Sequence, residues 1–323
     1  MKLSDRDRAI LSTIQYHGDE AIAGPAAALG FTESAVRRVV TRALDTGVLR
    51  RRVYVNSFAL GFHQYSIFFS ANARTATQRA RLRDLLVQSP ATELVLEVGG
   101  QFNYGIVVTA RSVFEAEAFL ENLTRDDAIS LSGVRIHART GWHYFGVKYL
   151  GSSPSARTTA IVPGTAIVTL APGDAEVLHA FGESPDGNRQ RIARSLGMPL
   201  STLSYRIDRL RTSGVIAGVL YQIVADTIGY EAFRVLVETS SPSRAYRTAL
   251  LKWAQAHPAV LTFMHGFGNW NYELRIETRD TRAARAAVDE LQDRFPEFIG
   301  TTELVPVSRV LKLATTPHAR LLR

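Results

Sequence analysis

Few residues of this sequence are arranged in a pattern that is typical of catalysis. The chain has 323 residues and no cysteine, which excludes disulfide bonds, thiolate chemistry and cysteine-ligated metals. Its eight histidines show no His-Glu-x-x-His spacing, and the sequence has neither a phosphate-binding glycine loop nor a Gly-x-Ser-x-Gly elbow. We therefore expect no catalytic residue, no metal site, no cofactor and no enzymatic activity. The histidines that could still form a cluster are His63, His137, His143 and His265.

Arginine has the clearest pattern among the charged residues. The net charge of the chain is +8, and residues 37–52 and 189–211 each hold six Arg and one Asp. Guanidinium groups bind phosphates and base edges, so two such concentrations favour nucleic acid as a partner. The alternative is an Arg-rich surface that is only solvated.

A third pattern is a short phrase that occurs twice, GQFNY at 100–104 and GNWNY at 268–272. Each copy has Gly, an aromatic residue, Asn and Tyr, followed by an alternating apolar run. The amide of Asn is both donor and acceptor and could meet a ligand. An Asn in a turn can equally bond its own backbone.

At the level of the elements that must position these residues, the whole chain repeats itself. LGFTESAVRRVVTRALDTGVL (29–49) aligns with LGMPLSTLSYRIDRLRTSGVI (196–216) at an offset of 167. LGF (60–62) aligns with IGY (228–230) at an offset of 168, as do the two Gly-aromatic-Asn-Tyr phrases. The Ser-, Thr-, Pro- and Gly-rich stretch between the copies is typical of a linker. We predict a tandem duplication with domains 1–60, 61–150, 168–227 and 228–323, and a linker at 151–167.

The front part of each copy predicts three short helices and an extended segment. In the second copy the helices are expected at 173–181, at 188–197 and from Ser201, whose hydroxyl could cap the third helix. The third helix buries a stripe at i, i+4 and i+7, formed by Leu203, Ile207 and Leu210. This order is a winged helix-turn-helix, with a β-ribbon expected in each copy and the third helix in the DNA major groove.

The back part of each copy predicts the order β-α-β-β-α-β. In the first copy the strands are expected at 63–73, 93–99, 104–110 and 134–150, and the helices at 76–89 and 113–123. This is the ferredoxin-like unit, an antiparallel sheet with helices on one face. The other face is uncovered within one unit and needs a partner. The fold class is therefore α+β.

This arrangement resembles the Lrp/AsnC family of transcription regulators. The similarity is specific at PLSTLSYRIDRLRTSGVI, at DTIGYEAFRVLVE and at the Gly-x-aromatic-x-Tyr turns, and it covers nearly the whole chain twice. The resemblance implies double-stranded DNA as a partner, a small effector such as an amino acid, and pairing of the sheets into dimers that assemble further. Because the duplication supplies both sheets, we expect an intrachain pseudo-dimer and homo-oligomers of such chains.

The resemblance also implies site residues in both copies. The DNA-contacting residues would be Ser34, Arg37, Arg38, Arg42 and Arg50, and Ser201, Ser204, Tyr205, Arg206 and Arg209. The effector-binding residues would be Gly100, Phe102, Asn103, Tyr104, Gly268, Trp270, Asn271 and Tyr272. The family usually has Asp where Asn103 and Asn271 stand, so a standard amino-acid effector is in doubt.

Two alternatives share the same fold. Siroheme decarboxylases resemble this family and would need His and Arg groups lining a tetrapyrrole cleft, for which Arg135, His137, Arg139 and Arg275 are candidates. A DNA-binding architectural protein without a ligand is the other. The sequence has no apolar run of about 18 residues, and its first thirty residues do not resemble a signal peptide. We expect a cytoplasmic protein that does not enter membranes.

Overall fold

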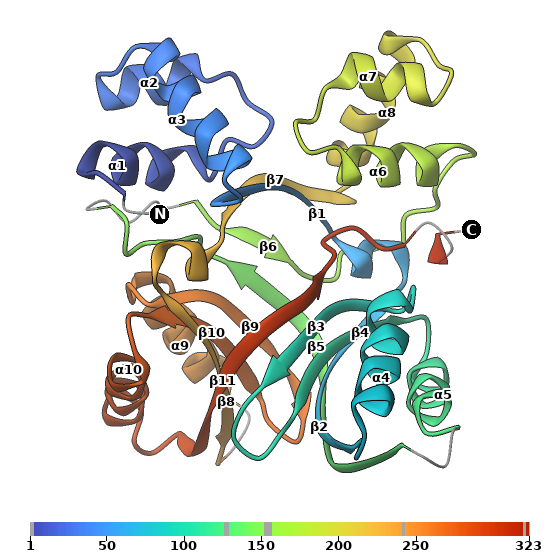
Figure 1. Cartoon of the computed structure of the whole chain (residues 1–323), viewed down its shortest axis with the longest axis vertical. Coiled ribbons are helices and arrows are strands. Elements are labelled where there is room, and N and C mark those ends of the chain that lie inside the picture. Colours follow the sequence, from blue (N-terminus) through green and yellow to red (C-terminus); the bar gives the residue numbers. More distant parts are fainter. Residues whose placement is uncertain (1–2, 126–128, 152–156, 241–242, 319–320, 323) are drawn as a thin grey trace.

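The computed structural model describes residues 3–125, 129–151, 157–240, 243–318 and 321–322, and it consists of two similar halves (Figure 1). Each half begins with a head of three helices and a strand. In the first head these are α1 (Asp5–Ile14), α2 (Ala23–Leu29), α3 (Glu33–Asp45) and β1 (Leu49–Val55). In the second head they are α6 (Asp174–Glu183), α7 (Arg189–Ser195), α8 (Leu200–Thr212) and β7 (Ile216–Ile223).

The turn before the third helix requires glycine in both heads. Gly30 and Gly197 have φ angles of 68° and 63°, a conformation that costs glycine little and ends the second helix. Thr32 then caps α3 by accepting from the backbone N–H of Ala35. In the second head the residue before α8 is Pro199, with no side-chain cap, so the expected capping role of Ser201 is wrong.

Each half continues with a β-α-β-β-α-β unit, as the sequence predicts. Short 3-10 helices, η1 (Ser57–Leu60) and η2 (Ala225–Ile228), lead from the heads into these units. The first unit comprises β2 (His63–Asn72), α4 (Ala76–Gln88), β3 (Thr92–Val98), β4 (Tyr104–Ala110), α5 (Val113–Leu123) and β5 (Ser130–Tyr144). The second comprises β8 (Glu231–Thr239), α9 (Arg244–Ala256), β9 (Val260–Gly268), β10 (Tyr272–Thr278), α10 (Thr281–Arg294) and β11 (Ile299–Leu313).

The two sheets join at their edges and close into a barrel. Among the described residues the strand order is β2-β4-β3-β11-β8-β10-β9-β5, and β5 pairs again with β2. The contacts between halves are β3 with β11 and β5 with β9, both antiparallel. Each of these eight strands therefore has a partner on both sides, which removes the exposed edges of an open sheet. The chain is an intrachain pseudo-dimer in which the faces without helices line the inside of one barrel.

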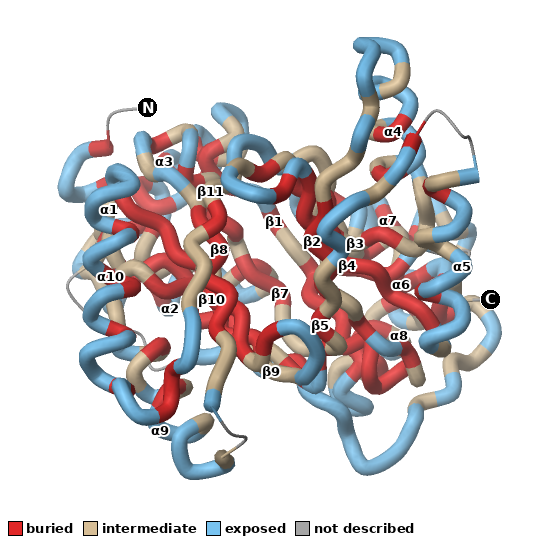
Figure 2. Tube along the Cα trace, turned by 90° about the horizontal axis from the view of Figure 1, so that it is seen from below, coloured by how far each residue is buried: buried red, intermediate tan, exposed pale blue. Residues whose placement is uncertain are grey.

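The hydrophobic core follows from this closure. α9 and α10 cover the outside of the second sheet, and α4 and α5 cover the first, each over its own buried apolar cluster. Figure 2 shows the strands as mostly buried and the outward sides of these helices as exposed. A further cluster lies inside the barrel and includes Phe68, Leu96, Phe102, Leu236 and Trp270.

The structure describes part of the predicted linker. Residues 152–156 lie outside the described residues. Beyond them, β6 (Thr159–Ile161) pairs with Trp142 to Tyr144 of β5 and extends the barrel sheet. In the part of the chain that the structure describes, no helix has the length and apolar character that a membrane span requires.

Candidate nucleic-acid interface and barrel cavity

The outer face of α3 presents exposed polar groups at the start of the helix. Its apolar positions Val36, Val40 and Ala43 are buried against the rest of the head, which turns the opposite face outward. Ser34, Arg37 and Arg38 are exposed on that face. Arg50 is also exposed and lies at the start of β1. These four predicted residues are placed where a DNA surface could reach them.

The corresponding face of α8 is less cationic. Leu203, Ile207 and Leu210 are buried, as the sequence predicts. Ser201 and Tyr205 are exposed and Ser204 is half-buried. The guanidinium of Arg209 also lies over the ring of Tyr205, 5.9 Å from its centre.

Three of the predicted DNA-contacting arginines are engaged inside their own heads. Arg42 binds Asp7 at 2.5 Å between Nη2 and Oδ1, and its counterpart Arg209 binds Asp174. Both pairs join the first helix of a head to the third. Arg206 binds Asp174 at 2.9 Å and the carbonyl oxygen of Pro172 at 2.7 Å. An acidic partner on the first helix thus holds each of these three arginines. Their contact with DNA stays a prediction.

The strand after each third helix does not form a separate wing. β1 of the first head pairs antiparallel with β7 of the second, from Leu49 opposite Ile223 to Val55 opposite Ile216. The expected β-ribbon is thus shared by the two heads. Arg51 is buried beside it and donates to the carbonyl oxygens of Gly18, Phe181 and Ser184, while burial lowers its pKa to about 10. Arg51 joins the heads and does not face DNA.

The two Gly-aromatic-Asn-Tyr turns are structural. The amide oxygen of Asn103 accepts from the backbone N–H of Ala71 at 3.1 Å. That of Asn271 accepts from the N–H and the hydroxyl of Thr239, both at 2.9 Å. Each Asn thus ties its turn to the end of the neighbouring strand, β2 or β8. Gly100 and Gly268 supply the positive φ angles, 86° and 133°, that the turns need.

The aromatic residues of these turns do not surround a ligand site. Phe102 and Trp270 are buried inside the barrel, where each ring lies 5.6 Å from that of Phe68. Tyr104 and Tyr272 point to the opposite side and pack in the clusters beneath the helices. These side chains therefore complete the core. Effector binding at the turns stays a prediction.

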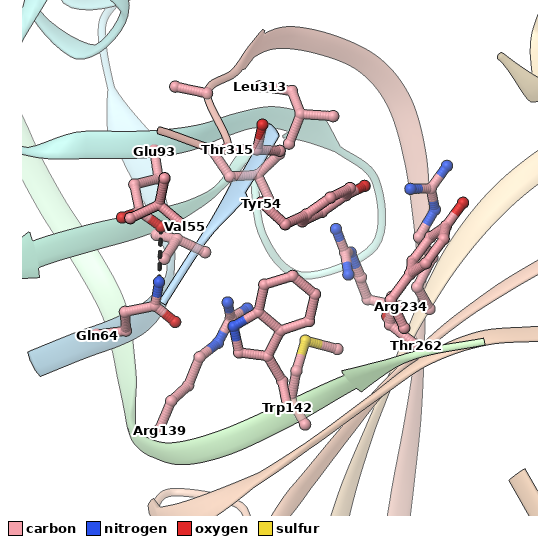
Figure 3. A pocket seen from close by; sticks show the side chains of 16 residues that line it. Tyr54, Val55, Gln64, Glu93, Arg139, Trp142, Arg234, Thr262, Leu313 and Thr315 are labelled. Carbon is pink, nitrogen blue, oxygen red and sulfur yellow. Dashed lines mark hydrogen bonds between the residues drawn. The ribbon is translucent and has the colours of Figure 1, made fainter. Parts of the chain in front are cut away.

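A cavity lies elsewhere in the barrel, where Tyr54 and Val55 of β1, the strand of the first head, reach it (Figure 3). We call it the barrel cavity; its volume is about 80 Å³. The side chains around it come from β1, from strands of both halves and from the segment after β11. They are Tyr54, Val55, Gln64, Glu93, Leu94, Val107, Arg139, Trp142, Tyr144, Arg234, Thr262, Met264, Arg275, Leu313, Ala314 and Thr315.

Three arginines that are largely withdrawn from solvent give the barrel cavity its electrostatic character. Arg139 and Arg234 share Glu273, with nitrogen-to-oxygen distances of 3.4 and 3.5 Å. Arg275 binds Glu277, which also accepts from the hydroxyl of Tyr149 at 2.5 Å. Burial lowers the pKa of Arg234 to about 10, so it stays charged at neutral pH. The arrangement is suited to an anion.

The histidines are spread over different environments. His137 is fully buried with its ring 5.4 Å from that of Trp270, and burial lowers its pKa to about 4. His143 and His265 lie 6.1 Å apart between ring centres, and His63 is exposed. Within the described residues no group of three or more His, Cys, Asp or Glu side chains could hold a metal ion.

The sequence did contain a signal for the barrel cavity. Glu273, Arg275 and Glu277 alternate with apolar residues along β10. A strand of this pattern is usually assigned a solvated polar face. In a closed barrel the same face points inward, and the two glutamates are buried while the side chain of Arg275 is mostly covered.

Comparisons with known proteins agree with this architecture. An uncharacterized HTH-type transcriptional regulator from Pyrococcus abyssi is 29% identical over 131 residues, which are 40% of this chain and 82% of that protein. The crystal structure of the siroheme decarboxylase NirDL matches 99% of this chain and 97% of its own, with a TM-score of 0.60 and 12% identity. An AsnC family transcriptional regulator from Agrobacterium tumefaciens matches 45% of this chain and 95% of its own, with a TM-score of 0.41 and 18% identity. No family model matches.

The chain is a tandem duplication of the Lrp/AsnC fold. The same comparison corrects one expectation. We predicted a protein that is not an enzyme, yet the solved structure that matches 99% of this tandem Lrp/AsnC chain is that of an enzyme. At 12% identity the match shows the fold alone and says nothing about the reaction.

Proposed function

We propose that this tandem Lrp/AsnC protein is a sequence-specific transcription regulator that binds double-stranded DNA through two unequal heads. The observation that carries the proposal is the exposed outer face of α3, where Ser34, Arg37 and Arg38 stand at the start of the third helix. In a helix-turn-helix protein these positions meet base edges in the major groove. The β1–β7 ribbon holds the second head beside the first, so both act on one DNA molecule.

The two heads differ in what they offer to DNA. At the start of the third helix and strand the first presents Arg37, Arg38 and Arg50, whereas the second presents Ser201 and Tyr205. The exposed cations Arg191 and Arg194 of the second head lie on α7 instead. Cations at the third helix would therefore come mostly from the first head. The preferred operator would therefore have two different half-sites and lack the symmetry that a homodimer of equal heads requires.

A mobility-shift titration with DNA from beside the gene tests the proposal. Replacing Arg38 with Ala should weaken operator binding by about tenfold or more, because one direct contact is lost. Arg50→Ala should mainly reduce the slope of log affinity against log salt, by about one unit. Arg285→Ala, an exposed change on α10 far from the heads, is the matched control. Equal affinity of the Arg38 and Arg285 variants would rule out this DNA surface.

A small-molecule enzyme is the second candidate function. The specific observation in its favour is the match of nearly the whole chain to the fold of NirDL. Arg139 and Arg275 line the barrel cavity, but His137 is enclosed by the core and the cavity of about 80 Å³ does not accommodate a tetrapyrrole. An absorption spectrum separates the two candidates. An intense band near ~400 nm in the purified protein would favour tetrapyrrole chemistry, for which the cofactor's own ring is the chromophore.

A further inference from the structure

Four of the side chains that line the barrel cavity have a buried polar atom without a partner among the described residues. These atoms are Gln64 Oε1, Trp142 Nε1, Arg234 Nε and Thr262 Oγ1. The side chains of Gln64, Arg234 and Thr262 are only 2%, 6% and 7% exposed. A buried polar atom without a hydrogen bond costs roughly 1–3 kcal/mol, so the three that can donate point to a bound acceptor. Gln64 Oε1 can only accept and is not satisfied by an anion.

The chemistry of these atoms selects an acceptor with negative charge. Two of them are N–H groups and a third is a hydroxyl that can donate. Arg139, Arg234 and Arg275 supply three positive charges, against the buried carboxylates of Glu273 and Glu277. The remaining carboxyl, Glu93, accepts from Gln64 Nε2 at 2.7 Å, and burial raises its pKa. Arg139 and Arg234 share the one carboxylate of Glu273, which leaves these two guanidinium groups able to bind a further anion.

The walls of the barrel cavity define the rest of the ligand. The ring of Tyr54 lies 5.8 Å from that of Trp142 and 5.5 Å from that of Tyr144, measured between centres. Met264 and Leu313 add apolar surface, and the gap between these side chains is visible in Figure 3. A small molecule with a compact apolar body fits this lining.

The two halves supply different polar groups to the barrel cavity, and Gln64, Glu93 and Arg139 come from the first half. Arg234, Thr262 and Arg275 come from the second half, and the residues 168 positions before them are Ser66, Leu94 and Val107. A symmetric homodimer would build two equivalent sites, whereas these uncharged counterparts cannot repeat the arginine arrangement. The duplication has thus left one site in each chain.

We propose that the barrel cavity binds one small monocarboxylate per chain. Arg234 and Arg139 hold its carboxylate group, Thr262 and Trp142 donate to its oxygen atoms, and its apolar body lies against Tyr54 and Met264. The site is separate from the Gly-aromatic-Asn-Tyr turns, whose aromatic side chains complete the core.

The barrel cavity also touches the strand that joins the heads. Tyr54 and Val55 line it, and the β1–β7 register is irregular between these two residues. The backbone N–H of Val55 donates to Thr315 in the segment after β11, at 2.9 Å. A ligand that presses on Tyr54 would therefore alter the ribbon on which the relative placement of the heads depends. This coupling to DNA rests on the proposed regulator function; the binding site itself does not.

Calorimetric titration of the full chain tests the site with matched pairs of probes. Acetate and propionate are compared with acetamide and propionamide, which keep the shape and lose the charge. We expect at least one carboxylate to bind one per chain with a dissociation constant of about 1 mM or tighter, and its amide to bind at least about tenfold more weakly. The fluorescence of Trp142 should change on binding, and Trp142→Phe should remove that change.

Variants on one strand provide the control. Arg139→Met should weaken carboxylate binding by about tenfold or more. Arg135→Met, on the same strand β5, should not, since Arg135 binds Glu238 and Glu303 and does not line the cavity. If Arg139→Met fails to fold, Thr262→Val keeps the shape of the side chain and should still weaken binding by about threefold to tenfold.

The outcomes separate the two proposals. No binding of either carboxylate up to about 10 mM, equal binding of acid and amide, or two sites per chain would overturn the carboxylate site. A tetrapyrrole bound in competition with the carboxylate would overturn it as well. Carboxylate binding that leaves DNA affinity unchanged would confirm the site and contradict its coupling to the heads. If the protein binds no DNA in any condition, the regulator proposal is contradicted and the carboxylate site is not.

Discussion

At the scale of single residues, an acidic side chain in each head does more for the fold than the sequence indicates. Asp174 is 2% exposed and accepts from Arg206, Arg209 and the backbone N–H of Ala171. Asp174→Asn should lower the free energy of unfolding by about 2 kcal/mol, because two guanidinium groups lose their carboxylate. Urea unfolding followed by circular dichroism measures this change.

The control for this variant lies in the same head. Asp208 is exposed on α8, and its carboxylate comes no closer to Arg189 than 3.8 Å. Asp208→Asn should therefore lower the free energy of unfolding by less than about 0.5 kcal/mol. Equal effects of the two substitutions would contradict the structural role of Asp174. The same contacts give Arg206 and Arg209 a role in the fold that the sequence does not show, because their acidic partner lies on another helix.

The buried histidine in the barrel makes stability depend on pH. Burial lowers the pKa of His137 to about 4, well below its ordinary value of 6.5. The unfolded chain therefore binds a proton more readily, and stability is lost as the pH falls from about 6.5 toward 4. Between pH 7 and pH 5 the contribution lost is about 2 kcal/mol. The check is the urea unfolding free energy at these two pH values.

A pair of variants assigns this pH dependence. His137→Leu removes the buried imidazole and should reduce the difference between pH 7 and pH 5 by about 2 kcal/mol. His63→Gln changes an exposed histidine at the start of β2 and should leave the difference as it is. If the difference between pH 7 and pH 5 is unchanged in His137→Leu, other groups cause the pH dependence.

At the scale of elements, the ribbon between the heads depends on a close approach. A Cβ on Gly18 would lie 2.8 Å from the backbone of Val219 and Leu220 in β7, closer than real Cβ contacts. Gly18→Ala should therefore push the first head away from β7 and cost about 1–3 kcal/mol. A Cβ on Gly24, inside α2, would meet nothing within 4 Å, and Gly24→Ala should add about 0.5–1 kcal/mol. We expect Gly18→Ala to lower Tm and Gly24→Ala to raise it.

The elements themselves could be predicted well from the sequence, but their partners could not. Helical periodicity predicted α6, α7 and α8, and the repeat offset of 167 to 168 residues predicted the matching helices of the first head. The pairing of β1 with β7 joins residues about 170 positions apart, and no local pattern specifies such a register. The barrel cavity could not be predicted for the same reason. Glu273 and Arg275 face inward only because the β3–β11 and β5–β9 pairings close the sheet.

At the scale of the whole molecule, the duplication has allowed the two halves to diverge. The first head carries more exposed cations at the start of its third helix and strand, while the second half supplies Arg234 and Arg275 to the barrel cavity. In a homodimer any substitution appears twice, so such a division is open only to a fused chain. One chain can thus combine one strongly cationic head with one internal anion site.

The fusion also means that the linker should not be needed to hold the halves together. β1–β7, β3–β11 and β5–β9 all cross between the halves, and the barrel cannot open without breaking a strand pair. A protease site placed at residues 152–156 should therefore be cut without separating the fragments. Native mass spectrometry should show both fragments in one particle, with one copy of each or an equal multiple if the chains associate as the family resemblance implies. Addition of urea should release them in a single transition shared with the loss of the fold, whereas fragments that separate in buffer alone would contradict the closed barrel.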